Sequence, residues 1–275
     1  KHVMRAASEN LVPVTLELGG KSPVIISDNS NFEVSVNRIM AGKTLNAGQI
    51  CLAPDYVFVP EGKKDNFVSQ SKEIVSKMYP TLKENPDYTS VINQRHYDRL
   101  KGYIDEAQDK GAEVIEINPS DEDFDQQPNH KIPPTLIVNP DEDLSVMKEE
   151  IFGPVLPIKT YSDISETINY INSKDRPLGL YYFGEDAKEL DDILKNTTSG
   201  GVTINDVVFH VAQDNAPFGG VGPSGTGSYH GIEGFKNFSH AKTIYTQTKF
   251  DGLINIFRPP YGSKAKNALK MQIKP

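Results

Sequence analysis

Short apolar runs alternate with amphipathic segments along most of this 275-residue chain, and the alternation limits the fold more than any other feature. The apolar runs have the length and the side chains of strands, whereas the segments between them repeat apolar residues at helical spacing. Strands that are separated by helices are typical of crossover connections in a parallel sheet. The sequence therefore predicts an α/β fold with a mostly parallel, twisted sheet that is flanked by helices.

The predicted elements follow one another closely from residue 13 onward. The first predicted helix begins at a capping-box sequence, in which Glu33 follows Ser30 by three residues. An acidic stretch without periodicity, residues 118–130, is predicted to be a surface loop. The predicted strands are residues 13–18, 24–26, 55–60, 112–117, 134–140, 179–184 and 200–206, and the later predicted helices are residues 63–79, 95–111, 163–172 and 188–197.

The charge and the cysteine content exclude several classes of protein. A net charge of −8 and a pI near 5.3 argue against a nucleic-acid or anionic-membrane partner. No apolar run approaches the roughly 20 residues that a membrane span needs, and the N-terminus lacks the apolar core of a signal peptide. A single cysteine excludes an internal disulfide and fits a reducing compartment, so we expect a soluble cytoplasmic protein.

Cys51, the only cysteine, admits two interpretations. A lone cysteine is usually a small buried hydrophobe without a chemical role. Here the residue follows a small, polar sequence, Gly48 permits a tight turn, and a predicted strand begins a few residues later. A thiol in that place can present its own backbone N–H to a bound carbonyl, which is what an oxyanion needs. At this level Cys51 is either a nucleophile or an inert core residue.

Glu17 interrupts an otherwise apolar run directly before Gly19 and Gly20. In one interpretation it is the outward-facing residue of an alternating strand. In the other, a carboxylate at a strand end beside a glycine turn is partly desolvated and acts as a general base.

The glycine-rich segment 215–231 contains a formal G-x-G-x-x-G match at residues 220–225. Pro223 interrupts the match and no βαβ pattern follows it, so we reject a dinucleotide-binding fingerprint. A loop near the mouth of an active site is the remaining interpretation. The histidines are scattered without metal-ligand spacing, but a spatial pair of Cys51 with His210 or His230 is left open.

Several motifs together resemble the aldehyde dehydrogenase superfamily. They occur in the order and spacing of that family and span nearly the whole chain. The ending INIFRPPYG, at residues 254–262, resembles the bacterial coniferyl-aldehyde-dehydrogenase type within the class-three branch. The four main motifs are LELGGKSP at residues 16–23, NAGQIC at 46–51, EEIFGPVLPI at 149–158 and PFGGVGPSGTGSYHGIEGFKNFSH at 217–240.

The resemblance implies a mechanism and its two catalytic residues. Cys51 would attack an aldehyde carbonyl as the thiolate, giving a thiohemiacetal, and would supply one oxyanion donor from its backbone. Hydride transfer to NAD or NADP would leave a thioester on the sulfur. Glu17 would then activate the water that releases a carboxylic acid.

The resemblance also implies binding residues. Glu150 would hydrogen-bond the nicotinamide ribose, Phe152 would pack beside the nicotinamide ring, and Leu18 and Gly19 would contact the cofactor. The residues implied near the substrate are Asn205 and, in the neighbouring segment 207–209, Phe209. Aromatic substrates such as coniferyl aldehyde and medium-chain aliphatic aldehydes both fit this branch.

The same resemblance suggests a division of the chain. Residues 1–20 would be the end of a dinucleotide-binding domain, residues 21–240 the catalytic thiol domain, and residues 241–275 an oligomerisation strand with a C-terminal tail. The strand is expected near 241–249, and the full-length protein is expected to be a homodimer. Because the chain starts at Lys1 without a methionine, we expect a piece of a longer protein that alone binds cofactor poorly and has little dehydrogenase activity.

Two other classes of function remain as hypotheses. One is a cofactor-independent thiol esterase or acyltransferase that uses Cys51 and Glu17 with a nearby histidine as base. The other is a non-catalytic assembly module, in which Cys51 is inert and the glycine-rich loop serves packing. Thiol reactivity and its dependence on NAD distinguish these classes.

Overall fold

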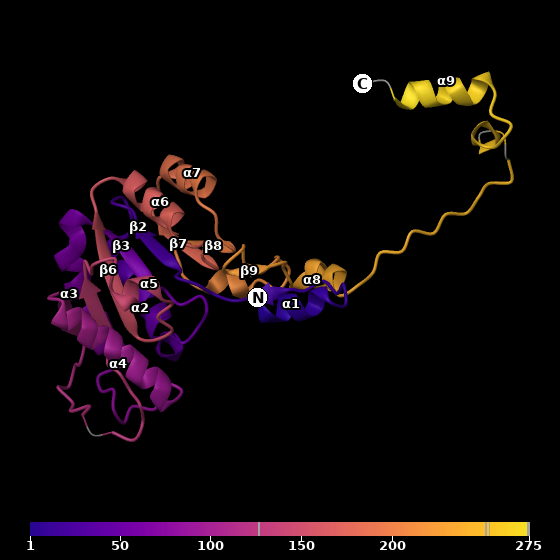
Figure 1. Cartoon of the computed structure of the whole chain (residues 1–275). Coiled ribbons are helices and arrows are strands. Elements are labelled where there is room, and N and C mark those ends of the chain that lie inside the picture. Colours follow the sequence, from indigo (N-terminus) through magenta and orange to yellow (C-terminus); the bar gives the residue numbers. More distant parts are fainter. Residues whose placement is uncertain (126, 251, 253, 274–275) are drawn as a thin grey trace. The chain divides into compact units, whose positions relative to one another are not determined.

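A seven-stranded sheet forms the centre of the computed structural model, with the strand order β4-β5-β6-β3-β2-β7-β8 (Figure 1). Neighbouring strands are parallel throughout, except that the edge strand β4 runs antiparallel to β5. The prediction of an α/β fold with a mostly parallel sheet is confirmed. The strands are β2 Pro23–Ile26, β3 Tyr56–Pro60, β4 Glu113–Glu116, β5 Thr135–Val138, β6 Val155–Tyr161, β7 Gly179–Phe183 and β8 Gly201–Ile204.

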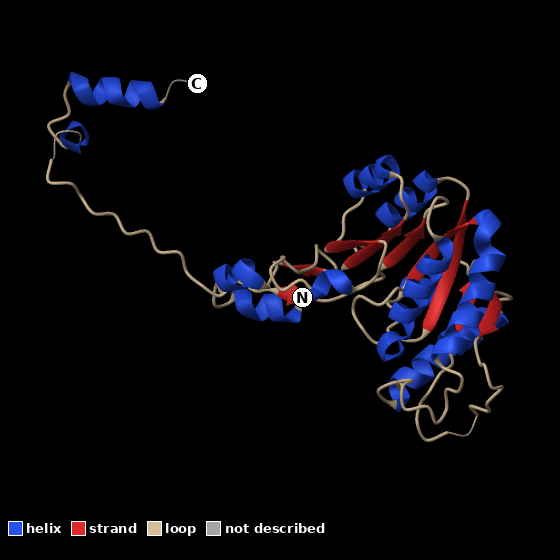
Figure 2. Cartoon of the chain, turned by 180° about the vertical axis from the view of Figure 1, so that it is seen from behind, coloured by secondary structure: helices blue, strands red, loops and turns tan. Residues whose placement is uncertain are grey.

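Helices cover both faces of this sheet because successive strand side chains point to opposite sides (Figure 2). In β3, Val57 and Val59 join the apolar cluster that contains residues of helices α2 and α3. Tyr56 and Phe58, at the alternate positions, join the cluster that contains residues of α6 and α7. The helices of these layers are α2 Phe32–Thr44, α3 Lys64–Met78, α4 Gln94–Asp109, α5 Ser145–Lys148, α6 Ile164–Ser173 and α7 Ala187–Asn196, and short 3-10 turns are η1 Leu45–Gly48 and η2 Glu61–Lys63.

Two local expectations were wrong, and one strand was missed. Helix α2 is capped by Asn31 and not by Ser30, because the Asn31 side chain accepts the hydrogen bond from the Val34 N–H, at 3.4 Å. The predicted strand 13–18 is reduced to β1, Leu16–Glu17, which pairs antiparallel with the equally short β9, Gly225–Thr226, outside the main sheet. Strand β6 was not predicted, because Pro157 and the Gly153–Pro154 pair before it obscure the strand pattern.

The structure describes residues 1–125, 127–250, 252 and 254–273. By its internal contacts this part divides into Lys1–Phe238, which holds both sheets, and Ser239–Pro275. The predicted loop 118–130 is irregular, with residue 126 outside the described residues, as are residues 251, 253, 274 and 275 of the predicted tail. The remaining elements are α1 His2–Ser8, η3 Phe209–Ala212 and α8 Gly231–Asn237 in the first unit, and η4 Ile254–Phe257 and α9 Ser263–Gln272 in the second.

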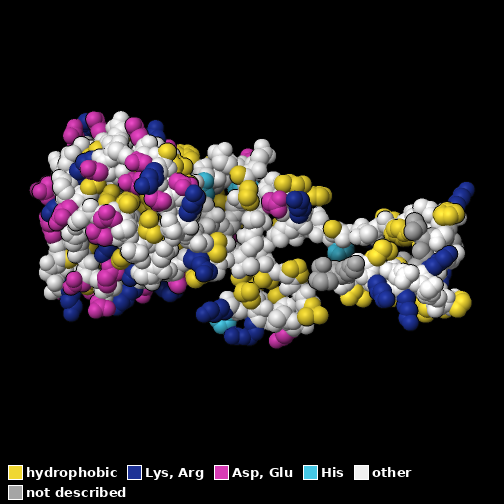
Figure 3. Space-filling view, turned by 90° about the horizontal axis from the view of Figure 1, so that it is seen from above, with side chains coloured by type: hydrophobic (Ala, Val, Ile, Leu, Met, Phe, Trp, Pro, Cys, Tyr) yellow, Lys and Arg dark blue, Asp and Glu magenta, His cyan; other side chains and the backbone are white. Residues whose placement is uncertain are grey.

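The strand expected near 241–249 does not form in the structure. A strand needs a neighbour for its backbone hydrogen bonds, and none of the described residues pairs with this segment. Within the described part of the chain, no helix combines the length and the apolar character that crossing a membrane requires. On the face of the first unit that Figure 3 shows, acidic and basic side chains are interspersed.

Candidate active site

The amino edge of the parallel sheet collects the residues that carry chemistry. Cys51 and Asp55 precede β3, Lys21 precedes β2, and Glu150 precedes β6. Because these strands run parallel, the residues before them meet at one edge although up to 129 positions separate them, from 21 to 150. Helix α2 returns the chain from the carboxyl edge and ends just before Cys51.

The turn in front of the cysteine is tightly specified. Asn46 and Ala47 have left-handed backbone conformations, with φ values of 50° and 52°. Gly48 has a φ of 72°, and a Cβ atom there would collide with the backbone oxygen of Gly153. The Gln49 side chain ties the turn to residues 90–92, because it donates to the Ser90 carbonyl at 3.0 Å and accepts from the Ile92 N–H at 2.9 Å. Such backbone strain persists only where the surroundings hold it in place.

Cys51 and Glu17 lie side by side. The half-buried thiol donates a hydrogen bond to the Glu17 carboxylate. Burial raises the pKa of Cys51 to about 12, and the negative charge of Glu17 and this hydrogen bond contribute in the same direction. The pKa of Tyr229 is also raised, first by burial and then by the charges of Glu17 and Cys51, which places its phenol near the pair. The resting thiol is therefore protonated, with a proton acceptor in contact.

Of the two interpretations of Glu17 that the sequence left open, the structure shows the outward-facing one. Its side chain is exposed at the end of β1. The ladder with β9 fixes it, since Glu17 pairs with Gly225 and the Leu18 N–H donates to the Ser224 carbonyl at 3.1 Å. The glycine-rich segment thus lies beside the Glu17 carboxylate. This position is compatible with the interpretation of the segment as a loop near the mouth of an active site.

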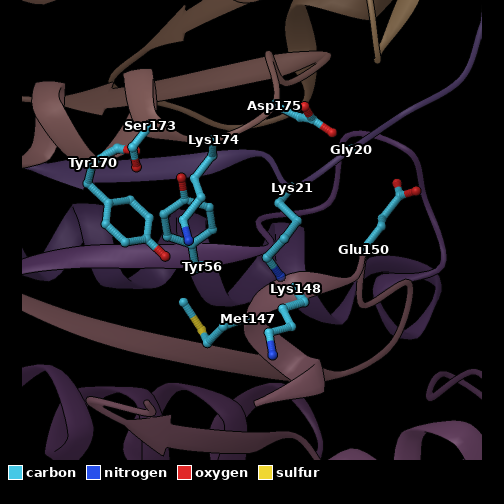
Figure 4. Close-up of a pocket in the computed structure, with 10 residues that line it drawn as sticks. All are labelled: Gly20, Lys21, Tyr56, Met147, Lys148, Glu150, Tyr170, Ser173, Lys174 and Asp175. Atoms are coloured by element: carbon cyan, nitrogen blue, oxygen red, sulfur yellow. The ribbon is translucent and has the colours of Figure 1, made fainter. Parts of the chain in front are cut away.

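Glu150 is the second carboxylate near the thiol, and it is more deeply placed than Glu17. Burial raises the pKa of Glu150 to about 7, although the Gly20 N–H donates a hydrogen bond to its carboxylate and opposes the shift. A Cβ atom on Gly19 would lie 2.7 Å from Oε1 of Glu150, so a side chain there would have to displace the carboxylate, and the φ of 130° itself favours glycine. Glu150 lines a pocket of about 390 Å³, and in Figure 4 Lys21 lies between it and the ring of Tyr56.

An ion pair that the sequence did not reveal holds the segment around Glu150. Lys21 pairs with the buried Asp55, and its ammonium also donates to the carbonyls of Val146 and Glu149, at 2.7 and 2.9 Å. Asp55 in turn accepts from the Ile151 N–H at 2.9 Å. The pair therefore fixes the backbone on both sides of residue 150. The available signal was a charged residue at the start of one predicted strand, Asp55, and another three residues before a second predicted strand, Lys21.

The remaining predicted binding residues fall in different places. Phe152, 39% exposed and with a φ of 49°, follows Glu150 on the same segment. Phe209, 60% exposed, lines a cavity of about 270 Å³ together with Leu45 and Val207. Asn205 lies after β8, at the carboxyl edge of the sheet, and its amide is bound to the backbone of Gly184 at 2.9 and 3.1 Å. The structure thus brings Phe209 to a cavity and gives Asn205 a place in a turn at the opposite edge from Cys51.

The two candidate histidines have other surroundings. Burial lowers the pKa of His210, whose Nδ1 is hydrogen-bonded to Thr203 at 2.8 Å, and the His230 ring stacks on Phe218. Among the described residues, no hydrogen bond joins either imidazole to Cys51. The described geometry therefore favours Glu17 over a histidine as the partner of the thiol.

Comparison with known proteins identifies the family of the chain. Residues 1–244 match the aldehyde dehydrogenase family, so the chain belongs to that family. A relative from Caulobacter vibrioides, named as a probable coniferyl aldehyde dehydrogenase, is 59% identical over 275 residues, which are 100% of this chain and 57% of the relative. The chain thus spans little more than half the length of such relatives.

Two solved structures show the same fold. A substrate-bound AldH from Staphylococcus aureus superposes with a TM-score of 0.88 at 39% identity, covering 99% of this chain and 58% of that one. A betaine aldehyde dehydrogenase from the same species, solved in complex with NAD+, superposes with a TM-score of 0.75 at 30% identity and covers 86% of this chain and 47% of its own.

Proposed function

We propose that this chain carries the thiol chemistry of an NAD(P)-dependent enzyme that oxidises an aldehyde to a carboxylic acid. One observation carries the proposal: the only cysteine, on a strained turn, donates its thiol hydrogen to an exposed carboxylate. A buried structural cysteine needs neither the strained turn nor the acceptor. Membership of the aldehyde dehydrogenase family supports the reaction class.

The chain's own residues can perform both halves of the reaction. Glu17 takes the thiol proton, the sulfur of Cys51 bonds to the carbonyl carbon of the aldehyde, and the carbonyl electrons move to oxygen, where the Cys51 N–H stabilises them. A nicotinamide nucleotide, when bound, would supply the hydride acceptor. Loss of the hydride from the carbon would leave a thioester on the sulfur of Cys51. Glu17, which is exposed, first gives the thiol proton up to solvent. It then takes a proton from water, the resulting hydroxide attacks the thioester, and the carbon–sulfur bond breaks to release the acid and the Cys51 thiolate, which regains a proton.

The cofactor-side residues fit a nicotinamide nucleotide. Two ribose hydroxyls need hydrogen-bond acceptors, and the Glu150 carboxylate lines a pocket large enough to admit them. Gly19 lies against that carboxylate, and a side chain there would displace it. We assign Glu150 to the ribose and the neighbouring Leu18, Gly19 and Phe152 to the nicotinamide end of NAD or NADP.

The aldehyde chain is assigned to the cavity along α2. Leu45 opens the turn that leads to Cys51, and Val207 and Phe209 face it from the segment after β8. This largely apolar lining suits an aromatic aldehyde, in keeping with the coniferyl aldehyde named for the Caulobacter relative, and a medium-chain aliphatic aldehyde is the alternative. A cytoplasmic location, the homodimer and the domain boundaries remain predictions from the sequence.

Intact-protein mass spectrometry after brief incubation with an activated acetate ester tests the proposal. We expect one acetyl adduct on the chain, and none on Cys51→Ala under the same conditions. Adding NAD distinguishes the esterase hypothesis, which requires turnover that is independent of the cofactor. A folded chain that gains no adduct at Cys51 would contradict the proposal and favour the assembly module.

A further inference from the structure

Residues 205–210 carry the chain from one edge of the main sheet to the other. They begin after the carboxyl end of β8 and end where the His210 ring lies against Gly179 and Gly201, the first residues of β7 and β8. Cys51 lies at this amino edge. The segment therefore follows the same course as helix α2, and the cavity of about 270 Å³ is lined by residues of both.

The backbone of this segment is strained at Val208. Its φ of 67° and ψ of −42°, with a hydrogen bond from the Phe209 N–H to the Val207 carbonyl at 2.7 Å, describe a γ-turn of the rare kind. A β-branched residue in such a conformation is an outlier that persists only where the surroundings hold it. Val208 is buried in the cluster that contains Leu52, the neighbour of Cys51. The turn thus links the environment of the thiol to Phe209, which lines the cavity.

Helix α2 holds the residues directly before the turn. The Arg38 guanidinium donates to the Asn205 carbonyl and lies 3.8 Å from the Asp206 carboxylate. Gly42, on the same helix, is in close contact with Val207, because a Cβ atom on the glycine would lie 2.2 Å from Cγ2 of the valine. Three successive residues are therefore fixed to α2. Ion pairs between partly exposed side chains add little to overall stability, so we expect Arg38 to act on the geometry of the segment.

We propose that Arg38 is a positioning residue for substrate selectivity: it fixes the residues before the γ-turn, and the turn holds the Phe209 ring as a wall of the aldehyde cavity. The inference rests on the proposed function, because it narrows the substrate class of the same cavity. An aromatic aldehyde gains from packing against a ring that is already held in place, since ring pairs contribute beyond the burial of area. A flexible alkyl chain gains only the burial. The cavity therefore selects aryl over alkyl aldehydes.

Acyl transfer to Cys51 from two 4-nitrophenyl esters tests this selectivity. The sulfur bonds to the acyl carbon, 4-nitrophenolate leaves, and the thiol proton passes to Glu17, so each ester gives the thioester that oxidation of the matching aldehyde would give. The 3-phenylpropanoate places an aryl group in the cavity, and the octanoate places an alkyl chain there. Release of 4-nitrophenolate measures each rate constant, and intact-protein mass spectrometry confirms the adduct. The readout is the ratio of the aryl to the alkyl rate constant in the same variant, so a general change in reactivity cancels.

The ratio should fall in two single variants. In Phe209→Leu we expect a fall of about three- to tenfold, which is the size of one aromatic pair contribution. Arg38→Gln should lower the ratio by a similar factor although the Phe209 ring is still present. The double variant should show no further fall, because Arg38 acts through Phe209.

Two further variants serve as controls. Arg38→Lys keeps the charge and a donor, and it should restore most of the ratio. Arg95→Gln makes the same chemical change at an exposed site on α4 and should leave the ratio at the parent value. An unchanged ratio in Arg38→Gln, or losses that add in the double variant, would contradict the inference.

The outcome separates from that of the acetylation test. Acetylation of Cys51 with a ratio that Arg38→Gln leaves unchanged would contradict the role of Arg38 alone. A folded chain that no ester acylates would contradict the proposed function and the inference with it.

Discussion

Two carboxylates approach the thiol of Cys51 from two regions of the molecule, and they are held in opposite ways. Glu17 ends a two-residue strand of the small β1–β9 sheet and is exposed. Glu150 precedes a central strand of the main sheet, lies against Gly19, and has a pKa raised to about 7 by burial. Both raise the pKa of Cys51, but only Glu17 also accepts its hydrogen bond.

The difference teaches that environment, and not residue type, separates the roles. A carboxylate that is reached by solvent and contacts the sulfur is suited to move protons between thiol and water. A carboxylate that is held among fixed backbone groups is suited to bind a ligand in one orientation. The Lys21–Asp55 pair, which clamps the segment around Glu150, has no counterpart at Glu17 among the described hydrogen bonds.

The largest expected effect is on release of the acyl group. In Glu17→Gln we expect acetyl-Cys51 to form and then to hydrolyse at about one hundredth of the parent rate or less, because the water loses its general base. The decay of the adduct mass over time measures it. Glu9→Gln, which makes the same chemical change at an exposed site, should decay like the parent chain. If acetyl-Cys51 decayed in Glu17→Gln as fast as in the parent chain, another group would be the base, and the difference in role between Glu17 and Glu150 would not hold.

A smaller effect is expected at Gly19, which lies close to Glu17 in the chain and against the carboxylate of Glu150. Gly19→Ala forces a side chain onto a φ of 130° and against Oε1 of Glu150, so unfolding should become easier by about 1–3 kcal/mol. Urea denaturation measures the loss. Gly62→Ala is the matched control, because a Cβ atom there meets nothing within 4 Å. A Gly19→Ala chain as stable as the Gly62→Ala chain would mean that Glu150 is not confined there.

The smallest expected effect is the pH dependence that Glu150 gives to stability. Its folded pKa of about 7 lies above the ordinary value of 4.5, so the folded state holds a proton that the unfolded state has lost. This contribution therefore lowers stability as pH rises from about 4.5 to 7. Glu150→Gln should match the parent chain near pH 4.5 and melt about 2–4 °C higher at pH 8. Calorimetry at both pH values measures it, and a difference that does not grow with pH would contradict the burial argument.

The sequence predicted the parts of this picture that local patterns determine. The α/β fold followed from alternating apolar runs, and Cys51 stood out because its polar turn does not resemble the middle of a buried element. The sequence could not show that Lys21, Asp55 and Glu150 meet, because a parallel sheet brings together residues that lie far apart along the chain.

The sequence also did not show how exposed Glu17 is or at which edge of the sheet Asn205 lies. Nothing in the run around Glu17 shows that the strand is two residues long and pairs with the glycine-rich loop. Asn205 follows its strand, whereas Cys51 precedes one, and only the direction of the strands shows that such residues lie at opposite edges. Lys43 follows Ile39 by four positions in the helix, and its burial without a partner became visible only from the packing.

The pH dependence of Cys51 alkylation by iodoacetamide, in the parent chain and in Glu17→Gln, tests the central claim most directly. If the Glu17 carboxylate holds the thiol proton, its removal lowers the pKa of Cys51 from about 12. The variant should then react about tenfold faster or more at pH 8, because one pKa unit changes the thiolate fraction tenfold. Identical profiles in the two proteins would mean that the thiol and this carboxylate are not a pair.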